Sequence, residues 1–80
     1  MNIRHNTWYL LPDDTRVYAR EAGSGAMRLE DAHGVPLYHC IPGARSLYHL
    51  IFDPALHVHH AVACDLTPDD LRPAPLERTL

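Results

Sequence analysis

Short stretches of alternating apolar and polar residues, separated by turn residues, run along most of this chain. The alternation is clearest over residues 16–21, where the small apolar side chains of Val17 and Ala19 alternate with longer polar ones. Strand-forming composition recurs at 7–11, 16–21, 27–30, 37–41, 46–52 and 57–66. Because successive side chains of a strand point to opposite faces, this pattern predicts half-buried β-strands at a spacing of about ten residues.

Proline and glycine mark the boundaries between these stretches. Leu11–Tyr18 and Ile41–Tyr48 are near repeats, each with an aliphatic residue followed by Pro and, later, an aliphatic–Tyr pair. Pro at the second position of a turn pre-sets the backbone, so both repeats predict hairpins. A third turn ends at Gly34, which can adopt a positive φ. The chain is therefore predicted to be all-β, an antiparallel meander of five to six short strands forming a small SH3-like barrel or half-barrel.

A different signal follows the last strand. Thr67 is a good N-cap, Pro68 suits the first helical position, and the two Asp residues after it complement the helix dipole. Pro73 and Pro75 limit the helix to one short turn. We therefore expect a single small β domain over residues 1–66. A short helical turn and a loosely ordered, Pro-containing tail are expected over residues 67–80.

The second hairpin is apolar on both of its faces. Alternation places Leu37, Ile41, Leu50 and Phe52 on one face and Cys40, Leu47 and Ile51 on the other. A strand that is apolar on both faces is either central in its sheet or has one face against a partner. Both interpretations stay open, and in the second a homodimer would bury the extra face.

Composition narrows the class of partner. The 80 residues include seven Arg and no Lys, and the formal net charge is −3. A nucleic-acid-binding protein usually carries a strong basic excess, so this balance favours a protein partner. The missing Lys is typical of GC-rich genomes and suggests a bacterial or phage origin. Two Cys, no apolar core of a signal peptide and no membrane-spanning apolar run predict a cytoplasmic protein with reduced thiols.

A cationic and aromatic face is predicted on the strand over 16–21. Arg16, Tyr18 and Arg20 share this face, and Arg28 of the next strand extends it. Guanidinium groups around an aromatic ring can hold an acidic patch of a protein partner, or stack on bases and clamp phosphates. The plainer interpretation is a solvent-facing strand whose Arg side chains pair with neighbouring acidic residues.

The run His57-Val58-His59-His60 is the sharpest chemical feature. His57 and His59 would share a strand face and could bind one metal ion, while Val58 and Val62 would face the core. A closed tetrahedral site needs two further ligands. The candidates are His39, His49, Cys40, Asp53 or a second subunit. The plainer interpretation is a set of exposed or half-buried histidines on an edge strand.

No catalytic or nucleotide-binding motif stands out. Cys40 and Cys64 lie in apolar contexts, where a thiol behaves as a small hydrophobe. The chain is predicted to be a non-enzymatic interaction module without a cofactor, a small bacterial or phage regulatory protein that binds a larger protein partner. One alternative is a Zn-, Ni- or Cu-binding protein that uses His57 and His59. A second is a single-stranded nucleic-acid binder that uses the Arg and Tyr face.

Overall fold

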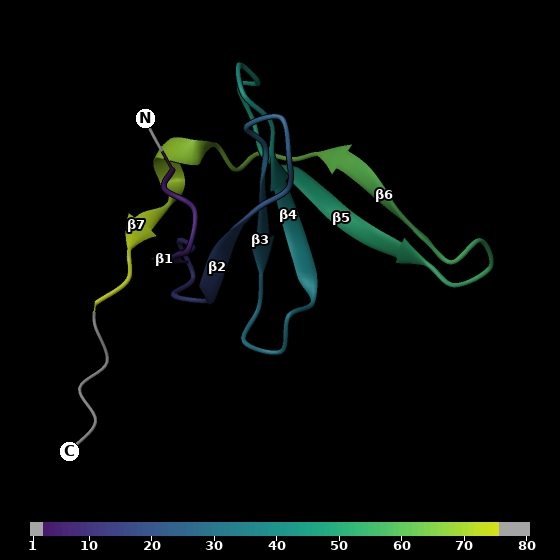
Figure 1. The fold of residues 1–80 in the computed structure, drawn as a ribbon, viewed down its shortest axis with the longest axis horizontal. Helices are drawn as coiled ribbons and strands as arrows, with labels where there is room; N and C mark the ends of the chain where they lie inside the picture. The colour runs from purple at the N-terminus through teal and green to yellow at the C-terminus, as the bar shows by residue number, and fades with distance from the viewer. Residues whose placement is uncertain (1–2, 76–80) are drawn as a thin grey trace.

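The structure is a computed structural model that describes residues 3–75. Its fold is a single antiparallel sheet. Its strands are β1 (Thr7–Leu10), β2 (Arg16–Glu21), β3 (Met27–Glu30), β4 (Pro36–Cys40), β5 (Tyr48–Asp53), β6 (Val58–Ala63) and β7 (Arg72–Pro73). They lie in the order β6-β5-β4-β3-β2-β1-β7, so all but the last follow the chain as a meander. The all-β antiparallel prediction is confirmed. The sheet is open, with β6 and β7 at its edges (Figure 1), so closure into a barrel is not confirmed.

The turns between strands follow the Pro and Gly positions, but the two near repeats adopt different turns. After β1, the N–H of Asp14 donates to the carbonyl of Leu11 at 2.8 Å, and Asp14 itself has a φ of 68°. After β4, the N–H of Ala44 donates to the carbonyl of Ile41 at 3.1 Å, and the positive φ lies one position earlier, at Gly43. A positive φ at the third position is the mark of a type II turn, which favours Gly there.

The core lies on one face of β1, β2 and β3. Its strand residues are Tyr9, Val17, Ala19 and Leu29, and its other members are Leu11, Leu47 and Leu71. These last three come from the connections between strands, so loops cover the core face. With seven buried apolar residues in the part of the chain that the structure describes, the core is small, and each large side chain in it carries a substantial share of the hydrophobic stabilisation.

The segment after β6 returns to the start of the sheet. It forms the expected short helical turn as a 3-10 helix, η1 (Pro68–Asp70), whose entry is held by a hydrogen bond from the Thr67 N–H to the Asp70 carboxylate at 2.8 Å. Strand β7 then pairs with β1, and Arg72 donates to the carbonyl of Leu11 at 2.9 Å. The expected loose tail thus has its first residues paired with the sheet, and residues 76–80 lie outside the described residues.

The β5–β6 hairpin leaves the rest of the sheet. Only two residue pairs, Tyr38–His49 and His39–Tyr48, join β5 to β4, whereas six pairs join β5 to β6. Residues 48–63, which we call the arm, therefore project from the body as a two-stranded ribbon (Figure 1). All residues of β6 are exposed.

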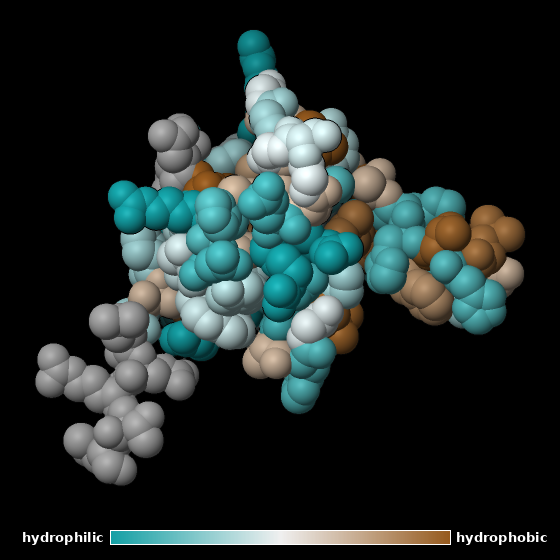
Figure 2. Space-filling model, viewed as in Figure 1, coloured by the Kyte–Doolittle hydropathy of each residue, from teal (hydrophilic) through white to brown (hydrophobic). Residues whose placement is uncertain are grey.

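This projection corrects one expectation. Val58 and Val62 share a strand face as predicted, but that face does not point into the core. Their exposed fractions are 45 % and 48 %, because the arm extends beyond the part of the sheet that the core covers. Figure 2 shows the apolar residues of the arm at the surface, well separated from the body.

Candidate interaction surfaces

The four residues predicted to bind a partner lie on one face of β2 and β3, opposite the core. The β2–β3 register places Arg20 directly across from Arg28 and Tyr18 across from Glu30. The β1–β2 register places Trp8 across from Tyr18. Directly opposite residues of an antiparallel pair share a face, so an indole and a carboxylate join the predicted cationic face. Whether these residues bind a partner stays a prediction.

Glu30 organises the cationic part of this face. Its side chain is buried, with 5 % of the residue exposed, and its carboxylate accepts hydrogen bonds from Nε of Arg20 at 2.9 Å and Nε of Arg28 at 3.0 Å. The hydrogen bond and charge of Glu30 raise the pKa of the Arg20 guanidinium. Both guanidiniums stay about half exposed, with side-chain exposures of 53 % and 43 %. One buried carboxylate thus positions two cations that solvent, or a partner, can reach.

The aromatic rings alternate with guanidiniums along the same face. The Arg16 guanidinium lies 5.3 Å from the centre of the Trp8 ring, and the Arg20 guanidinium lies 5.3 Å from that of Tyr18. The two rings meet edge to face, with their centroids 5.2 Å apart. We call Arg16, Trp8, Tyr18 and Arg20 the Arg–aromatic ladder. Cation–π and edge-to-face contacts favour this order and hold the side chains in place.

A shallow hollow of about 180 Å³ lies beside the ladder, lined by Trp8, Tyr18, Arg20, Glu30, Asp31, Ala32 and Gly34. It is formed where the β3–β4 turn passes the ladder. The sequence interpretation had not included Trp8. The usable signal was the turn at 11–14, which fixes the hairpin register and so the residue across from Tyr18.

The proposed metal ligands lie on the arm, near its tip. His57 precedes β6 in a turn with a φ of 53°, and both His57 and His59 contact the ring of Phe52, with centroid distances of 6.4 and 5.2 Å. The one carboxylate of the arm, that of Asp53, contacts His60 instead, with 3.1 Å between Asp53 Oδ2 and His60 Nε2. Among residues 3–75 no group of three or more His, Cys, Asp or Glu side chains could hold a metal ion.

The other suggested ligands lie elsewhere. His49 stacks on Tyr38 at the base of the arm, with 5.1 Å between ring centroids. His39 lies across from Arg28 on one side and from Tyr48 on the other. Cys40 lines a groove in the body. The structure therefore does not bring them to His57 and His59, whose role in metal binding stays a prediction.

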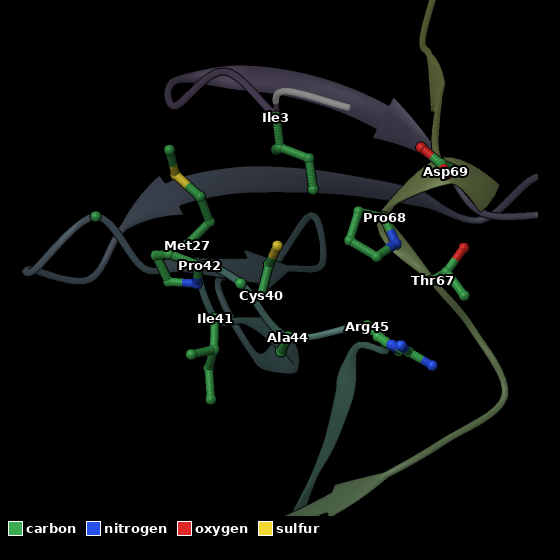
Figure 3. Close-up of a pocket in the computed structure, with 12 residues that line it drawn as sticks. Ile3, Met27, Cys40, Ile41, Pro42, Ala44, Arg45, Thr67, Pro68 and Asp69 are labelled. Carbon is green, nitrogen blue, oxygen red and sulfur yellow. The ribbon is translucent and has the colours of Figure 1, made fainter.

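An open groove of about 710 Å³ is formed by four segments of the chain: Ile3, residues 25–27, residues 40–45 and residues 67–69 (Figure 3). Cys40 lines it, and burial raises the pKa of the Cys40 thiol. A raised pKa leaves the thiol protonated at neutral pH, and the protonated form is not the nucleophile. Cys64 donates its S–H to the carbonyl of Leu47 at 3.2 Å.

The Arg–aromatic ladder is thus the surface where charge, aromatic area and a buried anchoring group come together. In the described part of the chain no helix is long and apolar enough to cross a membrane. Comparison of the chain with protein-family models, with curated proteins and with solved structures gives no match.

Proposed function

We propose that this protein is a non-enzymatic interaction module, and that the Arg–aromatic ladder together with Arg28 binds an acidic segment of a protein partner. The observation that carries the proposal is the buried Glu30 carboxylate, which holds two guanidiniums side by side on an exposed aromatic face. A small regulatory protein of bacterial or phage origin that docks on a larger protein would use such a surface.

Charge is distributed unevenly over the molecule. The chain has a formal net charge of −3, yet three of its seven Arg, namely Arg16, Arg20 and Arg28, share one face, and two of them bond to the buried Glu30 carboxylate. Arg, Trp and Tyr are the residues most enriched at the energetic centres of protein interfaces. The remainder of the acidic chain would repel a strongly acidic ligand elsewhere, which directs such a ligand to this face.

The ladder is also ordered before any ligand binds. Each guanidinium is held by a ring, by Glu30 or by both, so few rotamers are lost on binding. Pre-organised side chains lose less conformational entropy than free ones, which favours affinity. A guanidinium bonded through Nε still has N–H donors on its outer nitrogens for a carboxylate.

The test uses peptides selected for binding from a library enriched in Glu and Asp, with affinity measured by fluorescence anisotropy. Arg16→Gln combined with Arg20→Gln is expected to weaken binding by about tenfold or more, because both cations of the ladder are lost. Gln at position 20 can still donate a hydrogen bond to Glu30, which protects the fold. The matched control is Arg45→Gln, an exposed Arg on the groove, which should leave affinity unchanged.

The competing nucleic-acid class is tested in the same assay with a single-stranded oligo(dT). Binding of the oligonucleotide more tightly than any selected peptide, with affinity that falls steeply as salt rises, would contradict the proposal. Equal losses in the ladder variant and in the Arg45→Gln control would contradict it as well.

A further inference from the structure

The arm presents a second surface, independent of the ladder. We infer that residues 48–63 form a self-association element, through which two copies of this chain pair their β6 edges and form a symmetric dimer. This inference rests on the arm alone and holds whether or not the ladder binds a partner.

An isolated two-stranded ribbon is marginally stable in water, and stability requires a third strand or a packed face. Beyond His49 the arm has neither within its own chain: β4 pairs with β5 at two positions only, and β6 is an edge strand. Five of its large apolar residues are exposed by 45 to 64 %. They are Ile51, Phe52, Leu56, Val58 and Val62. The arm therefore has the apolar composition of a hairpin that packs against another element, yet no element that the structure describes packs on it.

Pairing of two β6 edges also brings apolar side chains of the two copies together. Val58 and Val62 are 45 % and 48 % exposed and share one face of β6. Across an antiparallel edge, side chains on one face stand opposite or diagonal to those of the neighbouring strand and contact them. Phe52 lies on the other face, opposite His59, and Leu56 lies in the turn, so neither takes part in this contact.

The edge of β6 carries none of the features that normally prevent pairing. Natural edge strands are protected by Lys, Pro or bulges, and Val58–Ala63 contains neither Lys nor Pro and pairs with β5 in unbroken register. Its open backbone groups can accept another strand along their whole length.

The low charge of the arm favours a second copy of the chain as the strand that pairs with β6. Asp53 is the one acidic residue in the arm, the arm has no Arg, and the Asp53 carboxylate is engaged with His60. An acidic or basic foreign segment would find no matching charge here. An identical uncharged edge pairs without like-charge repulsion.

Symmetry agrees with the apolar pattern. A twofold axis between antiparallel edge strands runs perpendicular to the sheet and keeps each face on its own side. Ile51, Val58 and Val62 share one face of the arm, because Ile51 pairs with His60, two positions from each Val. Antiparallel pairing of two β6 strands therefore joins this apolar stripe to the same stripe of the second copy.

The test is sedimentation equilibrium over about 10–200 µM, concentrations that cover weak to moderate dimers. We expect a mass of twice the 9.1 kDa of the chain. Val58→Lys combined with Val62→Lys should leave a monomer at every concentration. The matched control is Val35→Lys, because Val35 is as exposed as Val62, at 48 %, and lies outside the arm. This control should remain dimeric.

A second measurement does not depend on any variant. On dilution of the wild-type protein, the backbone amide signals of β6 should shift and their hydrogen exchange should accelerate, while those of β2 and β3 stay unchanged. A wild-type monomer throughout this range would overturn the inference. A dimer that survives the two Lys substitutions, or that Val35→Lys also breaks, would overturn it too. Peptide affinity at the ladder, measured on the Lys variant, reports separately on the proposed function.

Discussion

Replacement of Leu71 by Ala is expected to destabilise the protein strongly, although Leu71 lies near the end of the chain. It is 2 % exposed and belongs to the core cluster. Truncation of a buried Leu to Ala costs about 2–5 kcal/mol, because transfer free energy is lost and a cavity remains. A chain of this size has a total stability of about 4–12 kcal/mol. A mid-range loss of about 3 kcal/mol would therefore remove a quarter or more of it, and lower Tm by about 12–24 °C.

The assay is equilibrium unfolding in urea, followed by the fluorescence of Trp8, the single Trp of the chain. Trp8 fluorescence monitors the docking of the C-terminal segment on β1. The carbonyl of Trp8 accepts a hydrogen bond at 3.1 Å from the N–H of Ala74, which lies just after β7. The control is Leu56→Ala, a Leu that is 64 % exposed, whose substitution should change stability by no more than about 0.5 kcal/mol. One low protein concentration throughout keeps self-association out of the comparison.

Coincident unfolding curves for the Leu71→Ala and Leu56→Ala variants would contradict this prediction. They would mean that residues 64–73 do not pack on the sheet in solution, and that the core is closed by something else. A lowered midpoint with an unchanged denaturant slope is the expected result, since the substitution removes packing without changing the extent of the folded chain.

Three further predictions concern single groups. Gly34→Ala should lower the free energy of unfolding by about 1–2 kcal/mol, because Gly34 has a φ of +82° while nothing lies within 4 Å of an added Cβ. Gly34→Asn should lower it less in the same unfolding assay. An equal loss for both variants would indicate a steric clash and not backbone strain. Cys40 should react slowly with iodoacetamide at pH 7.5 and faster in urea, because burial raises its pKa; mass spectrometry measures both rates, and equal rates would contradict the burial. The Asp31 carboxylate accepts hydrogen bonds from the N–H groups of Val35 and His33, which lower its pKa below 3.8. Its contribution to stability is therefore present above that pH and is lost as the pH falls through the lowered pKa; a carboxyl ¹³C NMR midpoint at or above 3.8 would contradict this.

Local patterns predicted most of the fold because most of it is local. The strand positions follow from alternation and from Pro and Gly, and the meander order follows because short turns force neighbouring strands to pair. Strand β7 was not predicted: it has two residues, one of them Pro73, and its pairing with β1 depends on the return of a distant segment.

The projection of the arm could not be predicted either. Apolar residues on both faces of a strand are typical of a central strand. They are equally typical of a strand whose second face binds another molecule. The difference lies in where β4 stops pairing with β5: the register ends at Tyr38–His49, so the preceding residues of β4, Pro36 and Leu37, give Leu50 and Ile51 no partner. Local alternation in β5 does not contain this end point.

The candidate site also has parts that local sequence patterns predict and parts that depend on tertiary structure. That Arg16, Tyr18 and Arg20 share a face follows from the period of a strand, and Arg28 joins them by register. The burial of Glu30 between two guanidiniums is a tertiary fact, since the sequence shows a Glu within reach but not which Arg it holds. The separation of His39 and His49 from the histidines of the arm depends on strand order and length, which local spacing does not contain.

The strand order has a consequence for how the chain folds. Every pair in the sheet except β1–β7 joins strands that are neighbours in sequence, so hairpins can form one after another with short loops to close. The β1–β7 pair joins residues near opposite ends of the chain, such as Tyr9 and Pro73. Its closure costs the most loop entropy, and it gains little until the core face exists for Leu71 to cover. We therefore expect a folding reaction in which the meander assembles first and the C-terminal segment docks last, as the step that completes the core.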